Sequence, residues 1–319
     1  MKKILVIGSA GQIGSELTME LRKKYGNDNV IAGIRKTQPS EEIKNSGPVE
    51  VIDAMNIDDI ENVIKKYEVD SIFHLASLLS AVGEKNPDLA WKVNMGTLKN
   101  MLDLAKKHNI KLFWPSSIAC FGPTTPRVDT PQTTVLEPNT MYGITKVAGE
   151  LLCNYYFEKF GVDVRSLRYP GIISYKTLPG GGTTDYAIEI FYDAIKKGEY
   201  SCFLKADATL PMMYMPDAIK ATIDIMEAEK DNIKIRTSYN LAAVSFSPEE
   251  IFNEIKKHIP DFKISYEPDF RQNIADSWPK TIDDSKARED WKWNHGYTLE
   301  KMTNHMLEQL KMKLKDSDV

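Results

Sequence analysis

Cysteine is scarce in this 319-residue sequence, and long apolar runs are absent. The three cysteines, Cys120, Cys153 and Cys202, are far apart and odd in number, so they predict neither a disulfide framework nor a zinc site. We therefore expect a reduced, cytoplasmic protein. No apolar stretch approaches the roughly 20 residues that cross a bilayer. The first apolar run ends at Gly8 and is too short for a signal peptide, so we expect no membrane association.

An excess of charge of one sign is also lacking. The chain has 41 Lys and Arg against 45 Asp and Glu, a formal net charge of −4, which gives no reason to expect nucleic acid as a partner. His74 and His108 have no partners at metal-binding spacing, so we expect no metal. The hydrophobic content of 42% is that of an ordinary globular protein, long enough for one large domain or a domain with a smaller lobe.

Short apolar segments alternate with amphipathic ones through the first half of the chain. Nearly continuous apolar strands separated by helices are typical of a parallel sheet that is covered on both faces. The sequence therefore predicts an α/β fold, with a Rossmann-like doubly wound sheet over residues 1–172 that binds a dinucleotide. The expected strands are residues 3–8, 29–34, 49–53, 71–76, 111–117 and 162–170, and the expected helices are residues 12–25, 59–67 and 89–109.

The pattern changes after Pro170. A glycine-rich turn is followed by shorter strand and helix signals, and residues 218–228 and 298–315 are expected helices. Another helix is expected from Ser247, which forms a capping box with Glu250. We expect residues 173–319 to form mainly a smaller α/β substrate-binding lobe, with residues 215–243 or thereabouts returning to the first domain.

The segment GSAGQIG places three glycines between the first strand and the first helix. Gly8 permits a tight turn, Gly11 lets the backbone approach a pyrophosphate, and Gly14 allows close packing of helix on strand. The helix N-terminus, which begins at Gln12 and Ile13, supplies partial positive charge. The spacing is GxxGxxG rather than GxGxxG, but its strand-to-helix context favours dinucleotide binding over a plain turn.

The second strand ends without the acidic residue that usually holds the adenosine ribose about 20 positions further on. Gly33 stands where an acid would be comfortable, and Arg35 and Lys36 follow it. Arg35 would favour a ribose 2′-phosphate and therefore NADP. Both cations could instead be solvated loop residues, so the choice between NAD and NADP stays open. Asp53 is placed to accept a hydrogen bond from the adenine amino group, or else to cap a helix or lie in solvent.

The segment MYGITK puts Tyr142 and Lys146 one helical turn apart, a spacing that any surface pair on one helix face could have. The residues upstream decide whether this is a surface pair or the acid/base pair of a dehydrogenase. Ser116 and Ser117 end the fifth strand, at the edge where open α/β sheets bind their ligands. A nearby ammonium group would lower the phenol pKa from about 10, so Tyr142 could act as acid/base, while Ser117 holds the substrate oxygen.

These motifs, in this order and followed by RYPGI at 168–172, resemble the extended short-chain dehydrogenase/reductase superfamily. A longer set of segments is similar to the short-chain type of L-threonine dehydrogenase. This resemblance spans most of the chain and includes the substrate lobe, where members of the superfamily differ. The segments are residues 78–87, 121–126, 165–175, 180–194, 210–218 and 269–279.

The resemblance implies NAD-dependent oxidation of the L-threonine β-hydroxyl to 2-amino-3-ketobutyrate. It implies that Ser117, Tyr142 and Lys146 are catalytic, and that Tyr142 and Lys146 also contact the cofactor. For the substrate it implies Ser80, Ser117, Tyr142, Thr183, Thr184 and Trp278, although loop hydrogen bonding or core packing would also account for Ser80, the threonines and Trp278. The implied cofactor contacts, beyond those already named, are Ala54, Leu75, Ala76, Asn94, Tyr169 and Ile172; simple solvation in mid-helix is the alternative for Asn94.

The chain departs from the family pattern at two points. The family has an Asp near the end of the second strand, in a segment like ASDIRK, whereas this chain reads AGIRK. The expected pocket also has no obvious arginine for the substrate carboxylate; hydroxyls and backbone amides, Lys85 or Arg271 could serve. Glycines 180–182 suggest a mobile flap.

Two other functions use the same dinucleotide-binding fold. A nucleotide-sugar epimerase or dehydratase holds NAD and returns the hydride, and a redox sensor binds the dinucleotide without turnover. An intact Ser117, Tyr142 and Lys146 set speaks against the sensor. As in many members of the superfamily, the helices at 89–109 and 145–160 could pair with their copies in a homodimer.

Overall fold

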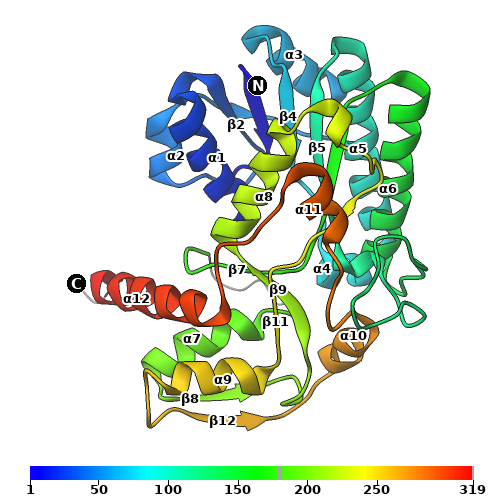
Figure 1. Ribbon diagram of the computed structural model, residues 1–319. Helices are drawn as coiled ribbons and strands as arrows, with labels where there is room; N and C mark the ends of the chain where they lie inside the picture. The colour runs from blue at the N-terminus through cyan, green and yellow to red at the C-terminus, as the bar shows by residue number, and fades with distance from the viewer. Residues whose placement is uncertain (178–181, 318–319) are drawn as a thin grey trace.

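The computed structural model describes residues 1–177 and 182–317. Its centre is a seven-stranded sheet in the order β10-β6-β5-β4-β1-β2-β3, in which all neighbouring strands are parallel (Figure 1). The predicted Rossmann-like α/β fold is thus confirmed, and six of the seven strands are those expected from the sequence. The strands are β1 Ile4–Ile7, β2 Val30–Ile34, β3 Val49–Val51, β4 Ser71–His74, β5 Lys111–Ser117, β6 Val164–Tyr169 and β10 Tyr239–Asn240.

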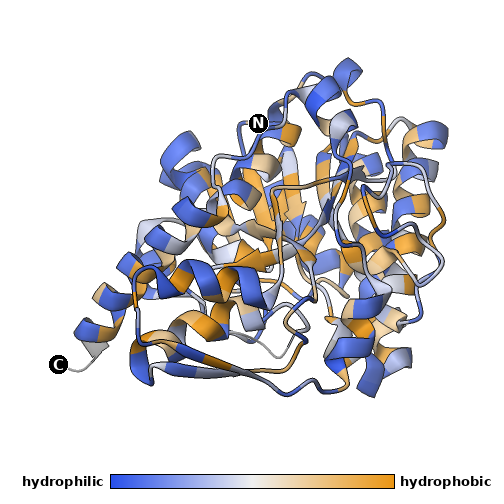
Figure 2. Ribbon diagram, turned by 60° about the horizontal axis from the view of Figure 1, so that its bottom comes forward, coloured by the Kyte–Doolittle hydropathy of each residue, from blue (hydrophilic) through white to orange (hydrophobic). Residues whose placement is uncertain are grey.

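Both faces of this sheet are buried, which explains its nearly continuous apolar strands. In β1, Ile4 and Val6 pack on one face with α1, α8 and α11, whereas Leu5 and Ile7 pack on the other with α3, α5 and α6. Figure 2 shows the hydrophobic strands enclosed by helices that are hydrophilic outside. The helices are α1 Gln12–Tyr25, α2 Glu41–Ser46, α3 Ile57–Tyr67, α5 Pro87–His108, α6 Met141–Phe160, α8 Met215–Glu227 and α11 Ser285–Trp291.

A smaller lobe lies below the sheet in Figure 1. Its apolar core joins α7, α9 and α12, and the predicted capping box of α9 is present, with Ser247 and Glu250 each accepting the other's backbone N–H. A three-stranded sheet, β11-β9-β7, lies at the junction. The elements are β7 Gly171–Ile173, α7 Tyr186–Lys196, β8 Glu199–Cys202, β9 Leu210–Tyr214, β11 Val244–Phe246, α9 Pro248–Lys256, β12 Lys263–Tyr266, α10 Arg271–Ser277 and α12 Leu299–Ser317. Short helices complete the fold: the α-helix α4 Ser80–Lys85 and the 3-10 helices η1 Asn27–Asn29, η2 Ile118–Cys120 and η3 Lys230–Asn232.

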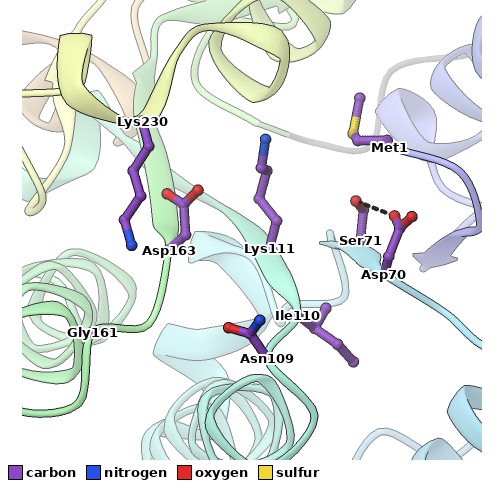
Figure 3. Close-up of a pocket in the computed structure, with 9 residues that line it drawn as sticks. All are labelled: Met1, Asp70, Ser71, Asn109, Ile110, Lys111, Gly161, Asp163 and Lys230. Atoms are coloured by element: carbon purple, nitrogen blue, oxygen red, sulfur yellow. Dashed lines mark hydrogen bonds between the residues drawn. The ribbon is translucent and has the colours of Figure 1, made fainter.

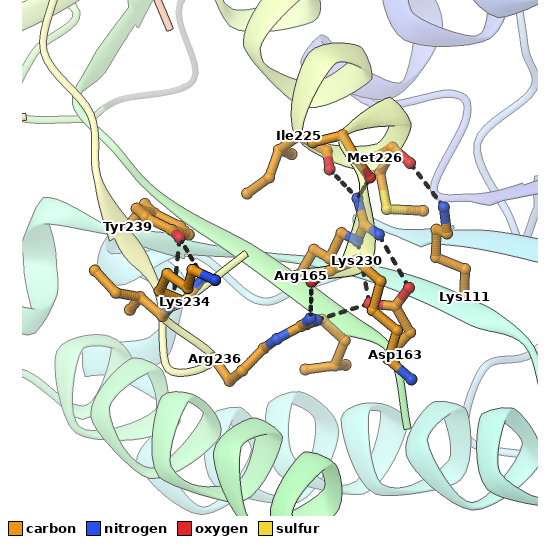
Figure 4. A network of polar contacts seen from close by, with 12 residues as sticks. Lys111, Asp163, Arg165, Ile225, Met226, Lys230, Lys234, Arg236 and Tyr239 are labelled. Atoms are coloured by element: carbon orange, nitrogen blue, oxygen red, sulfur yellow. Dashed lines mark hydrogen bonds and ion pairs between the residues drawn. The ribbon is translucent and has the colours of Figure 1, made fainter. Parts of the chain in front are cut away.

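An ionic network fastens the returning segment to the sheet. Asp163, just before β6, lies 3.0 Å from Arg165 and 2.7 Å from Arg236, and both guanidinium groups are almost fully buried. Arg165 also donates to the backbone oxygen of Ala228 after α8, and Arg236 donates to that of Val164 (Figure 4). The edge strand β10 follows directly, so these charges help to set its register on β6.

Parallel register brings the carboxyl ends of the strands to one edge of the sheet. Ile7 lies opposite Gly33 on one side and His74 on the other, and Ser117 lies opposite Tyr169. The loops that follow these residues therefore meet at one place. Within the described residues, no helix is both long and apolar enough to cross a membrane.

Candidate active site

The glycine loop after β1 has no room for side chains. A Cβ at Gly14 would lie 2.1 Å from the oxygen of Gly8, and Gly8 itself has φ +89, a conformation that favours glycine. Gly11 caps α1 without a side-chain hydrogen bond, and the first turn of α1 has no acidic residue. The backbone N–H groups from Gln12 and Ile13 onwards thus begin a helix that suits a phosphate group. A dinucleotide pyrophosphate fits this cradle.

The end of β2 corrects one expectation from the sequence. A Cβ at Gly33 would lie 3.0 Å from the oxygen of Val6 and 3.2 Å from the side chains of Ile7 and Ile52. An acid at position 33 would therefore be crowded rather than comfortable, and that prediction was wrong. The glycine lets β2 pack closely between its neighbours, and its oxygen accepts the N–H of Gly8 at 3.0 Å.

Arg35 and Asp53, which the sequence placed at the adenosine end, lie together. Arg35 Nη2 is 3.2 Å from Asp53 Oδ2, and Asp53 Oδ1 accepts the N–H of Met55 at 3.0 Å. The helix-capping alternative for Asp53 is wrong, because Asn56 caps α3. Ala54, the next residue, is buried.

Helix α6 brings Tyr142 and Lys146 to the end of β5 through unusually close packing. A Cβ at Gly143 would lie 2.2 Å from the oxygen of Ala119, and one at Gly149 would lie 2.4 Å from the ring of Trp114. The two glycines therefore let the helix axis approach the strand. Thr140 caps the helix by accepting the N–H of Gly143.

Lys146 is buried without a carboxylate as its nearest partner. Its Nζ donates to the oxygen of Pro115 at 2.6 Å, and lies 4.6 Å from the ring centroid of Trp114 and 5.2 Å from that of Tyr142. Burial lowers the pKa of Lys146 to about 7. Burial, to which the charge of Lys146 adds, also lowers the pKa of His74 to about 3, so this imidazole is neutral.

The phenol of Tyr142 differs from the expectation. Burial raises the pKa of Tyr142 to about 12, and the neighbouring Ser117 hydroxyl only partly opposes this rise. A lowered phenol pKa was predicted from the spacing to Lys146, but here the loss of solvent around the phenolate dominates. The ammonium group donates to Pro115 and lies over the ring of Trp114, and it also lies 5.2 Å from the ring centroid of Tyr142.

The structure separates the two serines at the end of β5. Ser116 donates to Glu150 at 2.6 Å, and Glu150 is also paired with Arg168, so Ser116 belongs to a buried network. Ser117 points the other way, as strand alternation requires, and accepts the N–H of Ala119 at 3.2 Å. Ser117 is the serine that lies beside Tyr142.

Asn94 is buried and holds the loop that follows β4. Its Oδ1 accepts the N–H of Leu78 at 2.8 Å, and its Nδ2 donates to the oxygen of Leu78 at 3.1 Å and to Thr145 at 3.2 Å. Mid-helix solvation, the plain alternative, is therefore wrong. Asn94 ties this loop to α6, in the turn between Tyr142 and Lys146. Leu75 begins the loop by donating to the oxygen of Ile7, and Ala76 follows.

Glu84 was not predicted from the sequence; its side chain on α4 accepts the N–H of Met141 at 2.7 Å and so holds the start of α6. Ser80 is the first residue of the same short helix. A carboxylate on a separate helix could be connected to Met141 only through the fold, since no local pattern links the two.

The other expected substrate and cofactor residues are more dispersed. Thr183 is buried, and the Thr184 side chain lies against β7, because a Cβ at Gly171 would be 2.7 Å from its methyl group. Ile172 is half-buried in β7. Trp278 is buried and belongs to the lobe core, with its backbone oxygen accepting from Arg127. Tyr169 is buried on the α8 side, and its hydroxyl pairs with Thr222.

Of the residues considered for the substrate carboxylate, Arg271 is paired with Asp269 at 2.7 Å and lies 3.1 Å from the centroid of the Phe203 ring. Lys85 is exposed at the end of α4. Of the glycines expected to form a flap, Gly180 and Gly181 lie outside the described residues.

A cavity of about 320 Å³ opens at the opposite edge of the sheet, near the amino ends of β4, β5 and β6 (Figure 3). It is distinct from the cluster around Tyr142. Its lining residues are Met1, Asp70, Ser71, Asn109, Ile110, Lys111, Gly161, Asp163 and Lys230. In the described part of the chain, no group of three or more His, Cys, Asp or Glu side chains could hold a metal ion.

A glycine cradle at the first strand, with a serine, tyrosine and lysine gathered at the same sheet edge, defines an oxidoreductase of the short-chain dehydrogenase/reductase type. The chain belongs to the NAD dependent epimerase/dehydratase family, whose model matches residues 4–242. An uncharacterized epimerase/dehydratase of Staphylococcus haemolyticus is 50% identical over 98% of this chain and 99% of its own length.

Solved structures confirm the resemblance predicted from the sequence. An L-threonine dehydrogenase from Clostridium difficile has a TM-score of 0.96 and 52% identity, covering 98% of both chains. The holo form of a GalE-like L-threonine dehydrogenase from Cupriavidus necator has a TM-score of 0.93 and 50% identity, covering 97% of this chain and 99% of its own. A UDP-glucose 4-epimerase from Thermotoga maritima, at 21% identity and a TM-score of 0.83, shares the fold.

Proposed function

We propose that the protein oxidises the β-hydroxyl of L-threonine to the 3-keto product, with NAD as the hydride acceptor. The observation that carries this proposal is the cluster of Ser117, Tyr142 and Lys146 at the carboxyl edge, beside the glycine cradle. The similarity to L-threonine dehydrogenases over 97–98% of the chain supports the choice of substrate.

The three residues divide the work on the substrate hydroxyl. The dinucleotide, when bound, accepts the hydride from the β-carbon. Ser117 holds the substrate oxygen by a hydrogen bond, and the oxygen of Tyr142 takes the hydroxyl proton. A phenol whose pKa is raised to about 12 is a weak source of phenolate, so a nearby positive charge is needed. Lys146 supplies that charge when it is protonated.

The substrate's charged groups would meet residues contributed by both parts of the molecule. We propose that Ser80 and the pair Thr183 and Thr184 bind the amino and carboxylate groups, and that Trp278 closes the pocket. Asn94 would position the loop that carries Ser80 through its hydrogen bonds to Leu78. On the cofactor side, we propose that the loop after β4 and residues Ala54 and Ile172 line the cradle.

Reduction of NAD⁺ by the purified protein with L-threonine tests this function. We expect absorbance of the reduced nicotinamide to appear with wild-type protein, and Tyr142→Phe to remove all but about 10⁻² to 10⁻⁴ of the rate. Ser116→Ala is a matched control that deletes the adjacent hydroxyl outside the cluster. No turnover of L-threonine with either NAD⁺ or NADP⁺ would reject the proposal. Tightly bound NAD in the purified protein would then favour an epimerase or dehydratase, and binding without turnover of any substrate would favour a sensor.

We propose a cytoplasmic homodimer. Helices α5 and α6 carry apolar side chains that are at least 40% exposed, including Trp91, Leu151 and Tyr155. Such exposed apolar faces suit pairing with a second copy of the chain. One relative at 48% identity is a monomeric L-threonine 3-dehydrogenase, so a monomer is the alternative to test. Light scattering of the purified chain decides: a dimer mass that is lost in Leu151→Glu supports the pairing, and a monomer mass rejects it.

A further inference from the structure

The adenosine end of the cradle lacks the carboxylate that usually selects an unphosphorylated ribose. From Gly33 to Ser40 the sequence contains no acidic residue, whereas Arg35 and Lys36 are both exposed there. In dinucleotide folds an acid at this strand end binds the ribose 2′-hydroxyl, and an arginine accommodates a 2′-phosphate. We propose that this site binds a 2′-phosphorylated adenosine, so that NADP is accepted alongside NAD. The inference rests on the proposed function only in using the same cofactor site.

The packing of the sheet leaves little room for an acidic side chain at position 33. Any side chain at position 33 would press on the oxygen of Val6 and on Ile7 and Ile52. At position 33 the strand therefore presents backbone rather than a carboxylate. The same residue holds the phosphate loop, since its oxygen accepts from Gly8 N at 3.0 Å and from Ser9 Oγ at 3.0 Å. Arg35, the first residue after β2, thus lies two residues beyond Gly33, whose oxygen holds the glycine loop.

The carboxylate at the end of the neighbouring strand does not restore the selection. Asp53 would repel a phosphate, but its Oδ2 lies 3.2 Å from Arg35 and its Oδ1 accepts the N–H of Met55. Its charge is thus largely offset by Arg35, while Lys36 adds a further positive charge nearby.

The ion pair is also weak enough to rearrange. The side chains of Arg35 and Asp53 are 55% and 39% exposed, and pairs at such exposure contribute about 0–1 kcal/mol. A phosphate dianion offers the guanidinium group two oxygens in the fork geometry that it binds best. Arg35 can therefore turn part of its fork to a phosphate at little cost, while another of its N–H groups stays near Asp53 and offsets the charge of that carboxylate.

Fragments that lack nicotinamide test the proposal without any turnover. Calorimetric titration of the full-length protein should show adenosine 2′,5′-bisphosphate binding about tenfold more tightly than 5′-AMP. Arg35→Ala should abolish most of that preference, and Arg35→Lys should keep part of it, because the charge remains but the fork is lost. Asp53→Asn should increase the preference, since it removes a negative charge and frees Arg35.

The matched control is Lys23→Ala, which removes an exposed cation from α1, with a side chain 78% exposed, and changes the net charge equally. It should leave the preference unchanged. Equal affinities for the two fragments in the wild-type protein, or a preference that survives Arg35→Ala, would overturn the inference. Circular dichroism of each variant checks that it is folded. Failure to oxidise threonine, with the fragment preference intact, would reject only the proposed function.

Discussion

The two edges of the central sheet hold their charged groups in opposite ways. At the amino edge, Asp163 is shared between Arg165 and Arg236, so each buried guanidinium group faces a carboxylate (Figure 4). At the carboxyl edge, Lys146 is equally buried, but a backbone oxygen and an aromatic ring hold it. The first arrangement is built at the start of β6, and the second where α6 packs on the neighbouring strand β5.

The pKa values record the difference. Burial alone would raise the pKa of Asp163, but the hydrogen bonds and charges of the two arginines lower it, so the carboxylate stays ionised. Burial lowers the pKa of Lys146 to about 7, close to neutral pH. Paired charges at one edge stabilise the fold, whereas a poorly compensated charge at the other is available for proton chemistry.

The largest effect should come from removing the cation at the carboxyl edge. Lys146→Met keeps the side-chain volume and deletes the charge that the proposed role of Tyr142 requires, so we expect the proposed oxidation of threonine to slow about 10³-fold. The thermal midpoint should not fall, because an expensive buried amine has been removed. A variant that unfolds at a lower temperature would show that Lys146 stabilises the fold, and would remove the contrast between the edges.

The amino edge should respond in the reverse manner. Asp163→Asn leaves two buried guanidinium groups without a carboxylate, so we expect a loss of about 3 kcal/mol in the free energy of unfolding, measured with urea. The rate per folded molecule should stay within about twofold, since Asp163 lies at the far end of the strands. Asp193→Asn, which breaks an exposed pair with Lys197 on α7, is the matched control and should change stability by less than about 0.5 kcal/mol.

A third test sharpens the contrast through pH. Between about pH 7 and 10.5 the unfolded chain binds a proton on Lys146 that the folded chain does not, so this lysine makes stability rise with pH across that window. The stability advantage of Lys146→Met should therefore be largest at pH 7 and below, and should disappear near pH 10.5. Urea unfolding of both proteins at pH 7, 8.5 and 10 measures it. A constant difference would mean that Lys146 keeps its ordinary pKa.

The smallest effect concerns the loop that completes the carboxyl edge. Asn94→Ala removes the hydrogen bonds to Leu78 and Thr145, and should lower the stability by about 1–3 kcal/mol. We also expect the KM for threonine to rise more than kcat falls, because Ser80 follows the anchored loop. If kcat alone changes, Asn94 acts on Tyr142 through Thr145 instead.

The sequence predicted the sheet well because its strands are buried on both faces and its helices carry strong local signals. It also pointed to Ser117, Tyr142 and Lys146, since each lies in a motif whose order along the chain is informative, and the structure places the three side chains close together. It predicted that an acid would be comfortable at position 33, because only the packing of Val6, Ile7 and Ile52 shows that this position is crowded. It predicted the wrong direction for the pKa of Tyr142, because burial depends on residues remote in the chain.

The junction between the two parts has a mechanical consequence. The chain passes between them where β7 leads to α7, β9 to α8, β10 to β11, α10 to α11 and α11 to α12, and β11, β9 and β7 are hydrogen-bonded to one another there. A body joined by a single linker can swing about any axis. A lobe joined through several hydrogen-bonded strands moves only where those strands bend together, which restricts its motion to a hinge along them. The route by which the lobe approaches the sheet is therefore prescribed by the fold, before any substrate arrives.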